Sequence, residues 1–159
     1  IHTVRNMDVY TELSRRYPAK EAIRMYYEDM LSCLEDYSDY DSLAHIDFID
    51  RYFLPDNPAP PFESYRELVE PVLRVLIENG KALEVNTGGL RRLPYAHPKK
   101  EILQLYAQMG GELLTMASDA HKPADIYHAF RETEKMLKEM GFKYIFKYKE
   151  RKKYPIHLI

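Results

Sequence analysis

Short apolar runs alternate with longer amphipathic stretches along the chain, and this alternation limits the fold more than any other feature. Apolar residues recur every three or four positions in stretches that predict helices at 19–37, 62–79, 99–109 and 123–140. Short apolar runs between and around them predict strands at 1–4, 42–47, 82–87, 113–116 and 144–148. Strands joined through helices in this way pair in parallel. The sequence therefore predicts an α/β fold of parallel βα units, in an open sheet or a barrel.

The composition is that of an ordinary soluble domain, and we predict a single domain over residues 1–159. The net charge of −2 gives no basic surface for nucleic acid, and no apolar run is long enough to span a membrane. The one cysteine, Cys33, excludes a disulfide framework and indicates a reducing, cytoplasmic location. The glycine motifs of dinucleotide-binding folds and P-loops are missing from the sequence.

Polar side chains stand at the C-terminal ends of several predicted strands. They are His2, His45 with Asp47, Asn86, and Asp119 with His121. The C-terminal ends of parallel strands share one edge of the sheet, so we expect these side chains to converge. Imidazole and carboxylate groups are ligands of Zn, Mn and Fe. Ligands brought together from separate strands predict a polynuclear metal site.

Asp119 and His121 taken alone are a weak signal, because an Asp that caps a helix beside an incidental His has the same spacing. Arg51, Arg91 and Arg92 strengthen the metal interpretation, since all three lie in loops expected at the same edge. A planar guanidinium binds phosphate oxygens in pairs. Together these residues predict metal-assisted hydrolysis of a phosphate ester, in which the metal generates hydroxide from a bound water.

Three features outside this edge have simpler interpretations. We predict that His97, which precedes Pro98, is a surface or capping group. His128 lies inside the predicted helix 123–140 and is expected to be packed or solvated. The basic stretch that begins at Arg151 is expected to be a solvated tail rather than a nucleic-acid patch.

Several of these stretches resemble the later motifs of the PHP (polymerase and histidinol phosphatase) superfamily. They are Leu43-Ala44-His45-Ile46-Asp47, the run from Leu83 to Arg91, and Ser118-Asp119-Ala120-His121. Ile1-His2 is similar to the end of that family's S-[VI]-H strand. The similarity is greatest to the PHP-type histidinol-phosphatases of histidine biosynthesis and extends over essentially the whole chain. It implies a distorted (βα)7 TIM-like barrel with a metal cluster at the C-terminal edge of its strands.

The resemblance also implies roles for individual residues. His2 and His45 would bind one metal ion, Asp119 another and His121 a third, with Asp119 and His121 also catalytic. The cofactors would be divalent ions of Zn, Mn or Fe, about two or three in a complete site.

The same resemblance assigns the arginines and two neighbouring polar residues. Arg51 follows the H-x-D motif and Arg91 follows the N-T-G-G motif, and both would hold the substrate phosphate. Asp47 and Ser118 would orient the metal ligands by hydrogen bonding.

The sequence departs from the family at its beginning. The family's opening H-x-H motif, its next histidine ligands and its bridging Glu have no counterpart in this sequence. We therefore expect the chain to be the C-terminal portion of a PHP-type barrel that lacks the N-terminal strands. These 159 residues alone are expected to bind metal weakly and to lack phosphatase activity.

The resemblance implies hydrolysis of L-histidinol phosphate to L-histidinol and phosphate, so the expected partner is a small phosphorylated molecule rather than nucleic acid or a membrane. Two alternatives stay open. The chain could belong to a PHP phosphoesterase or nuclease with another substrate. It could also be a non-catalytic scaffold or fragment, in which the missing ligands reflect a lost activity.

Overall fold

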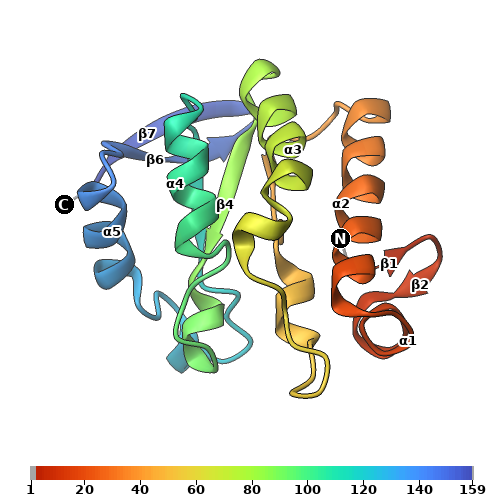
Figure 1. Cartoon of the computed structure of the whole chain (residues 1–159). Helices are drawn as coiled ribbons and strands as arrows, with labels where there is room; N and C mark the ends of the chain where they lie inside the picture. The colour runs from red at the N-terminus through yellow and green to blue at the C-terminus, as the bar shows by residue number, and fades with distance from the viewer. Residues whose placement is uncertain (1–2, 159) are drawn as a thin grey trace. The chain divides into compact units, whose positions relative to one another are not determined.

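The computed structural model of the chain describes residues 3–158, so the predicted ligand His2 lies outside the described residues. The chain divides into two compact units (Figure 1). The first unit comprises Ile1–Asp39 and Asp47–Val75, and the second comprises Tyr40–Ile46 and Leu76–Ile159.

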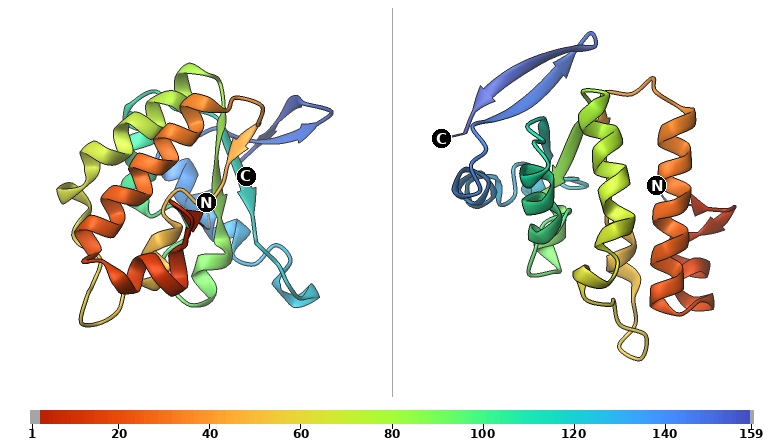
Figure 2. Two further views of the ribbon diagram at one scale, coloured as in Figure 1. Left: turned by 90° about the vertical axis from the view of Figure 1, so that its right-hand side faces the viewer. Right: turned by 45° about the horizontal axis from the view of Figure 1, so that its top comes forward.

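The first unit begins with an antiparallel hairpin of β1 (Thr3–Val4) and β2 (Met7–Asp8), which lies beside α2 (Figure 2). Its turn residues Arg5 and Asn6 have φ angles of 48° and 63°, the positive values of a primed hairpin turn. Thr3 and Val4, the described part of the strand predicted at 1–4, therefore form a strand of a hairpin. The predicted place of this strand in the parallel sheet is wrong, because the turn directs the chain back onto itself.

Helices make up most of the rest of this unit. They are η1 (Val9–Leu13), α1 (Ser14–Arg16), α2 (Ala19–Asp36), η2 (Phe48–Tyr52), η3 (Phe62–Ser64) and the first part of α3 (Arg66–Glu78). The helix predicted at 19–37 is confirmed as α2, which begins with the amides of Glu21 and Ala22 bonded to the Pro18 carbonyl. Its buried ring Tyr27 stacks on Tyr65 with ring centroids 6.1 Å apart.

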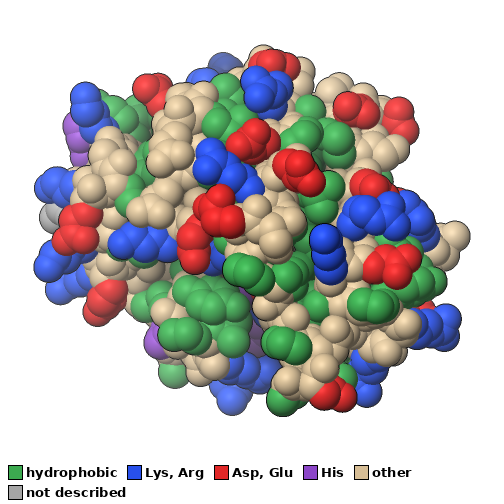
Figure 3. All heavy atoms as spheres, in the orientation of Figure 1, with side chains coloured by type: hydrophobic (Ala, Val, Ile, Leu, Met, Phe, Trp, Pro, Cys, Tyr) green, Lys and Arg blue, Asp and Glu red, His purple; other side chains and the backbone are tan. Residues whose placement is uncertain are grey.

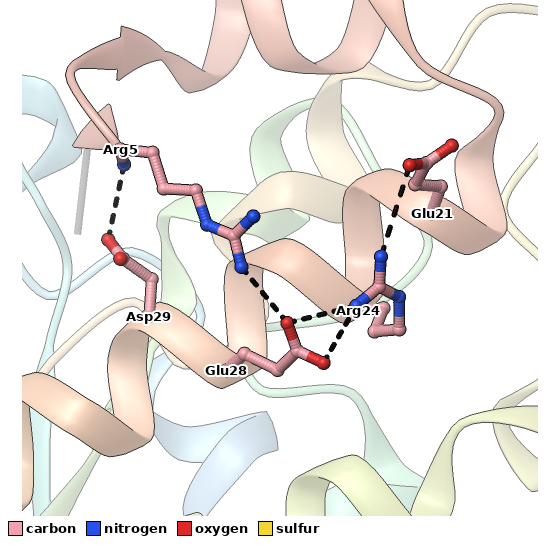
Figure 4. Close-up of polar contacts among 5 residues, drawn as sticks. All are labelled: Arg5, Glu21, Arg24, Glu28 and Asp29. Atoms are coloured by element: carbon pink, nitrogen blue, oxygen red, sulfur yellow. Dashed lines mark hydrogen bonds and ion pairs between the residues drawn. The ribbon is translucent and has the colours of Figure 1, made fainter.

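Acidic and basic side chains are interspersed on the face shown in Figure 3, as the near-neutral composition predicts. One cluster in the first unit connects the hairpin to α2 (Figure 4). Glu28 accepts hydrogen bonds from Arg5 at 3.1 Å and from Arg24 at 2.9 Å. Pairs this exposed stabilise a fold by at most about 1 kcal/mol. The fully buried Val4 therefore anchors the hairpin more firmly than these ion pairs do.

The second unit contains a parallel sheet with the strand order β3-β4-β5. The strands are β3 (Ser42–Leu43), β4 (Ala82–Asn86) and β5 (Leu114–Ala117). Leu83 of the central strand pairs with Leu43 on one side and Leu114 on the other. All three are buried, which is the burial expected of parallel strands between helical crossovers. The predicted α/β class and the parallel pairing are confirmed for these strands.

The helical segments of this unit are η4 (Thr87–Arg91), α4 (Lys100–Gln108), η5 (Pro123–Asp125) and α5 (Phe130–Glu139), together with the end of α3. The predicted helix 99–109 is confirmed as α4. The helix predicted from 123 begins only at Phe130, because Tyr127 and Ala129 have φ angles of 57° and 55°. His128 therefore lies in a turn rather than inside a helix.

Glycines end α3, α4 and α5, as predicted, through the same hydrogen-bond pattern, and the first two helices lead into the parallel sheet. After α3, Gly80 has a φ of 60° and the next amide, Lys81, donates to Leu76 at 2.8 Å. After α4, Gly110 has a φ of 87° and the next amide, Gly111, donates to Tyr106 at 2.8 Å. This pattern satisfies the last carbonyls of the helix.

Gly111 also allows a close approach to an aromatic ring. A Cβ at this position would lie 2.3 Å from Cε2 of Tyr106, which is 1% exposed. We expect Gly111→Ala to lower the free energy of unfolding by about 1–3 kcal/mol, measured by urea denaturation, because the buried ring must move. The control is Gly111→Ala in a Tyr106→Ala background, since the nearest atoms to the new Cβ all belong to the Tyr106 ring, which is then absent. An unfolding midpoint of Gly111→Ala equal to that of the wild type would contradict a close contact between Gly111 and the buried ring.

Tyr106 gives the fold a dependence on high pH. Its hydroxyl donates to the Leu113 carbonyl at 3.1 Å, and burial raises the pKa of Tyr106 to about 12. The folded state favours the neutral phenol, so this contribution to stability is complete below about pH 10 and is lost as pH rises through about 12. We expect the urea midpoint to fall over this range, and to fall less in Tyr106→Phe. An identical pH dependence in that variant would contradict the assignment.

The chain ends in a second hairpin, of β6 (Tyr144–Lys149) and β7 (Lys152–His157), drawn in blue in Figures 1 and 2. The strand predicted at 144–148 is confirmed, but it pairs with β7 and not with the parallel sheet. The stretch that begins at Arg151 is exposed, as expected, but it is a strand and not a tail, because Glu150 and Arg151 have φ angles of 51° and 63° and form another primed turn. Within residues 3–158, no helix is long and apolar enough to cross a membrane.

Candidate functional site

The C-terminal ends of β3, β4 and β5 lie at one edge of the parallel sheet in the second unit. His45 follows β3, Asn86 ends β4, and Ser118 and Asp119 follow β5. Figure 1 shows η4 and the segment after β5 at this same end. The predicted shared edge is confirmed for these three strands, although only β3 and β5 lead into predicted metal ligands.

The loop after β4 is built around Asn86, which is 2% exposed. Its Oδ1 accepts a hydrogen bond from the Gly88 amide at 2.9 Å, which turns the chain into η4. Its backbone exchanges two hydrogen bonds with His97. His97 was predicted at the surface or in a cap, and that is wrong, because this backbone bridge draws it inside to 1% exposure. Asn86 and His97 therefore shape the edge rather than face a substrate.

Arg91, at the end of η4, reaches across to the segment after β5. Its Nη1 donates to the Ser118 carbonyl at 2.7 Å and its Nη2 donates to the Asp119 carbonyl at 3.0 Å. Its Nε lies 4.0 Å from the Asp125 carboxylate. Sequence spacing predicted that Arg91 belongs to this edge but gave no sign of these contacts with the main chain.

His121 is held in one tautomer by the same short segment. Its Nδ1 lies 2.9 Å from the Asp119 carbonyl oxygen, which can only accept a hydrogen bond. Nδ1 must therefore carry the proton of the neutral ring, and Nε2 carries the lone pair. The imidazole is exposed, so Nε2 can act as a base or bind a metal ion.

Two predicted ligands have left-handed backbone conformations. His45 has a φ of 61° and Asp119 a φ of 51°. Each lies two residues after the end of a parallel strand, His45 after β3 and Asp119 after β5. Such conformations cost on the order of 1–3 kcal/mol and concentrate at functional sites. Both side chains are half-buried. Turn residues elsewhere in the chain share this conformation, so it adds to the position of His45 and Asp119 at this edge but does not by itself assign them a role.

Asp47 and Arg51 belong to the first unit. Asp47 is fully buried, and its carbonyl accepts a hydrogen bond from the Asp50 amide at 3.1 Å at the start of η2. The guanidinium of Arg51 lies over the Phe48 ring, 5.1 Å from its centroid. The orienting role of Asp47 and the phosphate-binding role of Arg51 stay predictions.

The described residues do not form a metal site by themselves. Among residues 3–158, no group of three or more His, Cys, Asp or Glu side chains is arranged to hold a metal ion. Protein metal sites take at least three protein ligands in most cases. Asp119 and His121 can therefore supply only part of such a site.

Comparison with known proteins gives similarity over most of the chain, although no family model matches it. A protein of Clostridium acetobutylicum named "Probable histidinol-phosphatase" is 30% identical over 155 residues, covering 97% of this chain and 61% of that protein. A protein of the same name from Thermotoga maritima is 35% identical over 128 residues, covering 80% of this chain and 52% of that protein. The chain thus spans little more than half the length of these curated relatives.

One solved structure shares the fold. It is a histidinol phosphate phosphatase of Lactococcus lactis subsp. lactis Il1403, crystallised with zinc, L-histidinol and phosphate. The TM-score is 0.78 at 24% identity, and the match covers 97% of this chain and 59% of the other. The α/β arrangement described above is therefore one found in a longer protein.

Proposed function

We propose that this chain is the C-terminal portion of a metal-dependent phosphomonoester hydrolase with a PHP-type (βα)7 barrel. Its reaction is the hydrolysis of L-histidinol phosphate to L-histidinol and phosphate. The observation that carries this proposal is the shared edge of β3, β4 and β5, where the Arg91 guanidinium and the His121 imidazole both contact the main-chain carbonyl of Asp119. The names of the similar proteins support the choice of substrate.

We assign His2, His45, Asp119 and His121 to a centre of divalent ions, Zn, Mn or Fe, with Asp119 and His121 also catalytic. What supports this assignment is the parallel pairing of β3 and β5 with β4, and the exposed imidazole of His121 with its Nδ1 against the Asp119 carbonyl. Residues 3–158 do not gather a complete set of ligands, so the remaining ones must come from elsewhere in the complete protein. Asp47 and Ser118 would orient the ligands, and Arg51 and Arg91 would meet the substrate phosphate.

The incomplete ligand set leads to a prediction for the isolated chain. We expect these 159 residues by themselves to bind divalent ions weakly and to release no phosphate from L-histidinol phosphate. Isothermal titration with Zn or Mn and a phosphate-release assay measure the two quantities. Robust hydrolysis by the purified 159-residue chain would contradict the proposed incomplete centre.

A substrate panel tests the proposed activity in the complete protein. Phosphate release is measured with L-histidinol phosphate, a nitrophenyl phosphate and a short oligonucleotide, each with Zn, Mn and Fe in turn. We expect kcat/KM to be highest for L-histidinol phosphate. Faster cleavage of the oligonucleotide would indicate a nuclease instead, against the mixed charge seen in Figure 3. No reaction with any of the three would indicate a non-catalytic scaffold.

A further inference from the structure

One guanidinium binds both peptide groups that flank Asp119. Arg91 donates through Nη1 to the Ser118 carbonyl at 2.7 Å and through Nη2 to the Asp119 carbonyl at 3.0 Å. Between these two planar groups only the φ and ψ angles of Asp119 can rotate. A planar guanidinium bound to both carbonyls therefore restricts both rotations, and with them the direction of the Asp119 side chain.

The conformation held in this way costs free energy, although Asp tolerates it better than most residues do. The φ of Asp119, 51°, lies in the left-handed region, which is unfavourable for residues with a Cβ. Hydrogen bonds from a charged donor are roughly twice as strong as those between neutral groups. Arg91 is thus in a position to stabilise the strained backbone at the end of β5.

The surroundings of Arg91 are built to hold it in place. A Cβ on Gly88 would lie 2.9 Å from Nη2 of Arg91 and 3.0 Å from the Ser118 carbonyl oxygen. The Asp125 carboxylate lies 4.0 Å from Nε, and the Arg91 side chain is only 24% exposed. These contacts distinguish Arg91 from a mobile surface arginine that waits for an anion.

The held carbonyl also determines the state of His121. The Asp119 carbonyl oxygen is shared by Nη2 of Arg91 at 3.0 Å and Nδ1 of His121 at 2.9 Å. A carbonyl has two lone pairs, so it can accept both hydrogen bonds at once. Releasing this carbonyl would release the imidazole too, and Nε2 would no longer be the unprotonated nitrogen of a fixed ring.

We propose that Arg91 is a positioning residue, which sets the backbone of Asp119 and the tautomer of His121 before any substrate binds. This role is additional to the proposed contact with the substrate phosphate, and unlike that contact it acts on Asp119 and His121 when no phosphate is bound. Its importance for catalysis rests on the proposed phosphatase function, whereas the effect on His121 does not.

The tautomer of His121 can be read by 15N NMR of the imidazole in the 159-residue chain, without metal or phosphate. The measurement is made in the pH range where the 15N shifts of the ring no longer change with pH, so that the neutral tautomers alone are compared. We expect an Nδ1–H tautomer in the wild type and a shift to mainly Nε2–H in Arg91→Ala. We expect the same shift in Arg91→Lys, because a single ammonium cannot replace the planar fork. Arg92→Ala removes an equal charge from the next, exposed residue and should leave the tautomer unchanged.

An Arg91→Lys variant that folds like the wild type and keeps the Nδ1–H tautomer would overturn the proposal, whatever the Ala variant does. In the complete enzyme, the positioning role also predicts that Arg91→Lys lowers kcat for L-histidinol phosphate by about 10-fold or more, as loss of a ligand-orienting group does. A rise in KM alone, with kcat unchanged, would limit the role of Arg91 in the enzyme to phosphate binding and contradict a positioning role in catalysis. If the protein shows no phosphatase activity at all, the NMR result still decides the positioning role.

Discussion

Asp119→Ala in the complete protein is expected to reduce kcat/KM for the proposed hydrolysis of L-histidinol phosphate by more than about 100-fold, since even groups that only orient metal ligands are worth 10- to 100-fold. The Asp119 carboxylate extends from a backbone that Arg91 holds through the carbonyls of Ser118 and Asp119. Few other side chains are therefore placed to substitute for this carboxylate. Its loss should remove bound metal along with activity. Phosphate release and elemental analysis of the same samples measure both effects.

Asp56→Ala provides the matched control, because it removes an exposed carboxylate from the first unit and should change neither measurement. His45→Ala should behave like Asp119→Ala, since we assign both side chains to the same metal centre. Wild-type metal content together with wild-type turnover in either site variant would show that the site is assigned to the wrong residues.

Leu83→Ala is expected to cause the largest loss of stability, about 2–5 kcal/mol in the free energy of unfolding. Leu83 is fully buried in the central strand, in register with Leu43 and Leu114 on either side. Truncation leaves a cavity between two neighbouring strands that cannot both move inward. Urea denaturation measures the change, with Leu54→Ala as control because Leu54 is 39% exposed. Equal unfolding midpoints for the two variants would mean that β4 is not the centre of the core.

The sequence predicted best the helices in which apolar residues repeat at helical spacing over many residues, and the helix ends that a glycine marks. The helix at 19–37 agrees with α2 to within its last residue, and the stops at Gly80 and Gly110 coincide with observed helix ends. The two hairpins were missed, because their turns use Arg5-Asn6 and Glu150-Arg151 without the glycine that usually marks such turns. Pairing partners of short strands also depend on contacts that periodicity does not record.

At the candidate site, residue spacing was enough to bring His45, Arg91 and Asp119 to one edge of a parallel sheet. It could not predict that the guanidinium of Arg91 binds main-chain carbonyls, because carbonyl groups are the same at every position of any sequence. Burial of His97 was likewise hidden, since it follows from a backbone bridge to Asn86 and not from the type of side chain.

The most direct test of the account is phosphate release from L-histidinol phosphate by the complete protein, before and after removal of metal with a chelator. We predict that turnover disappears on chelation and returns when Zn, Mn or Fe is added back. We also predict that added metal does not restore turnover in Asp119→Ala. Undiminished turnover in the chelated protein, or full recovery of Asp119→Ala with added metal, would contradict a metal centre at the ends of β3 and β5.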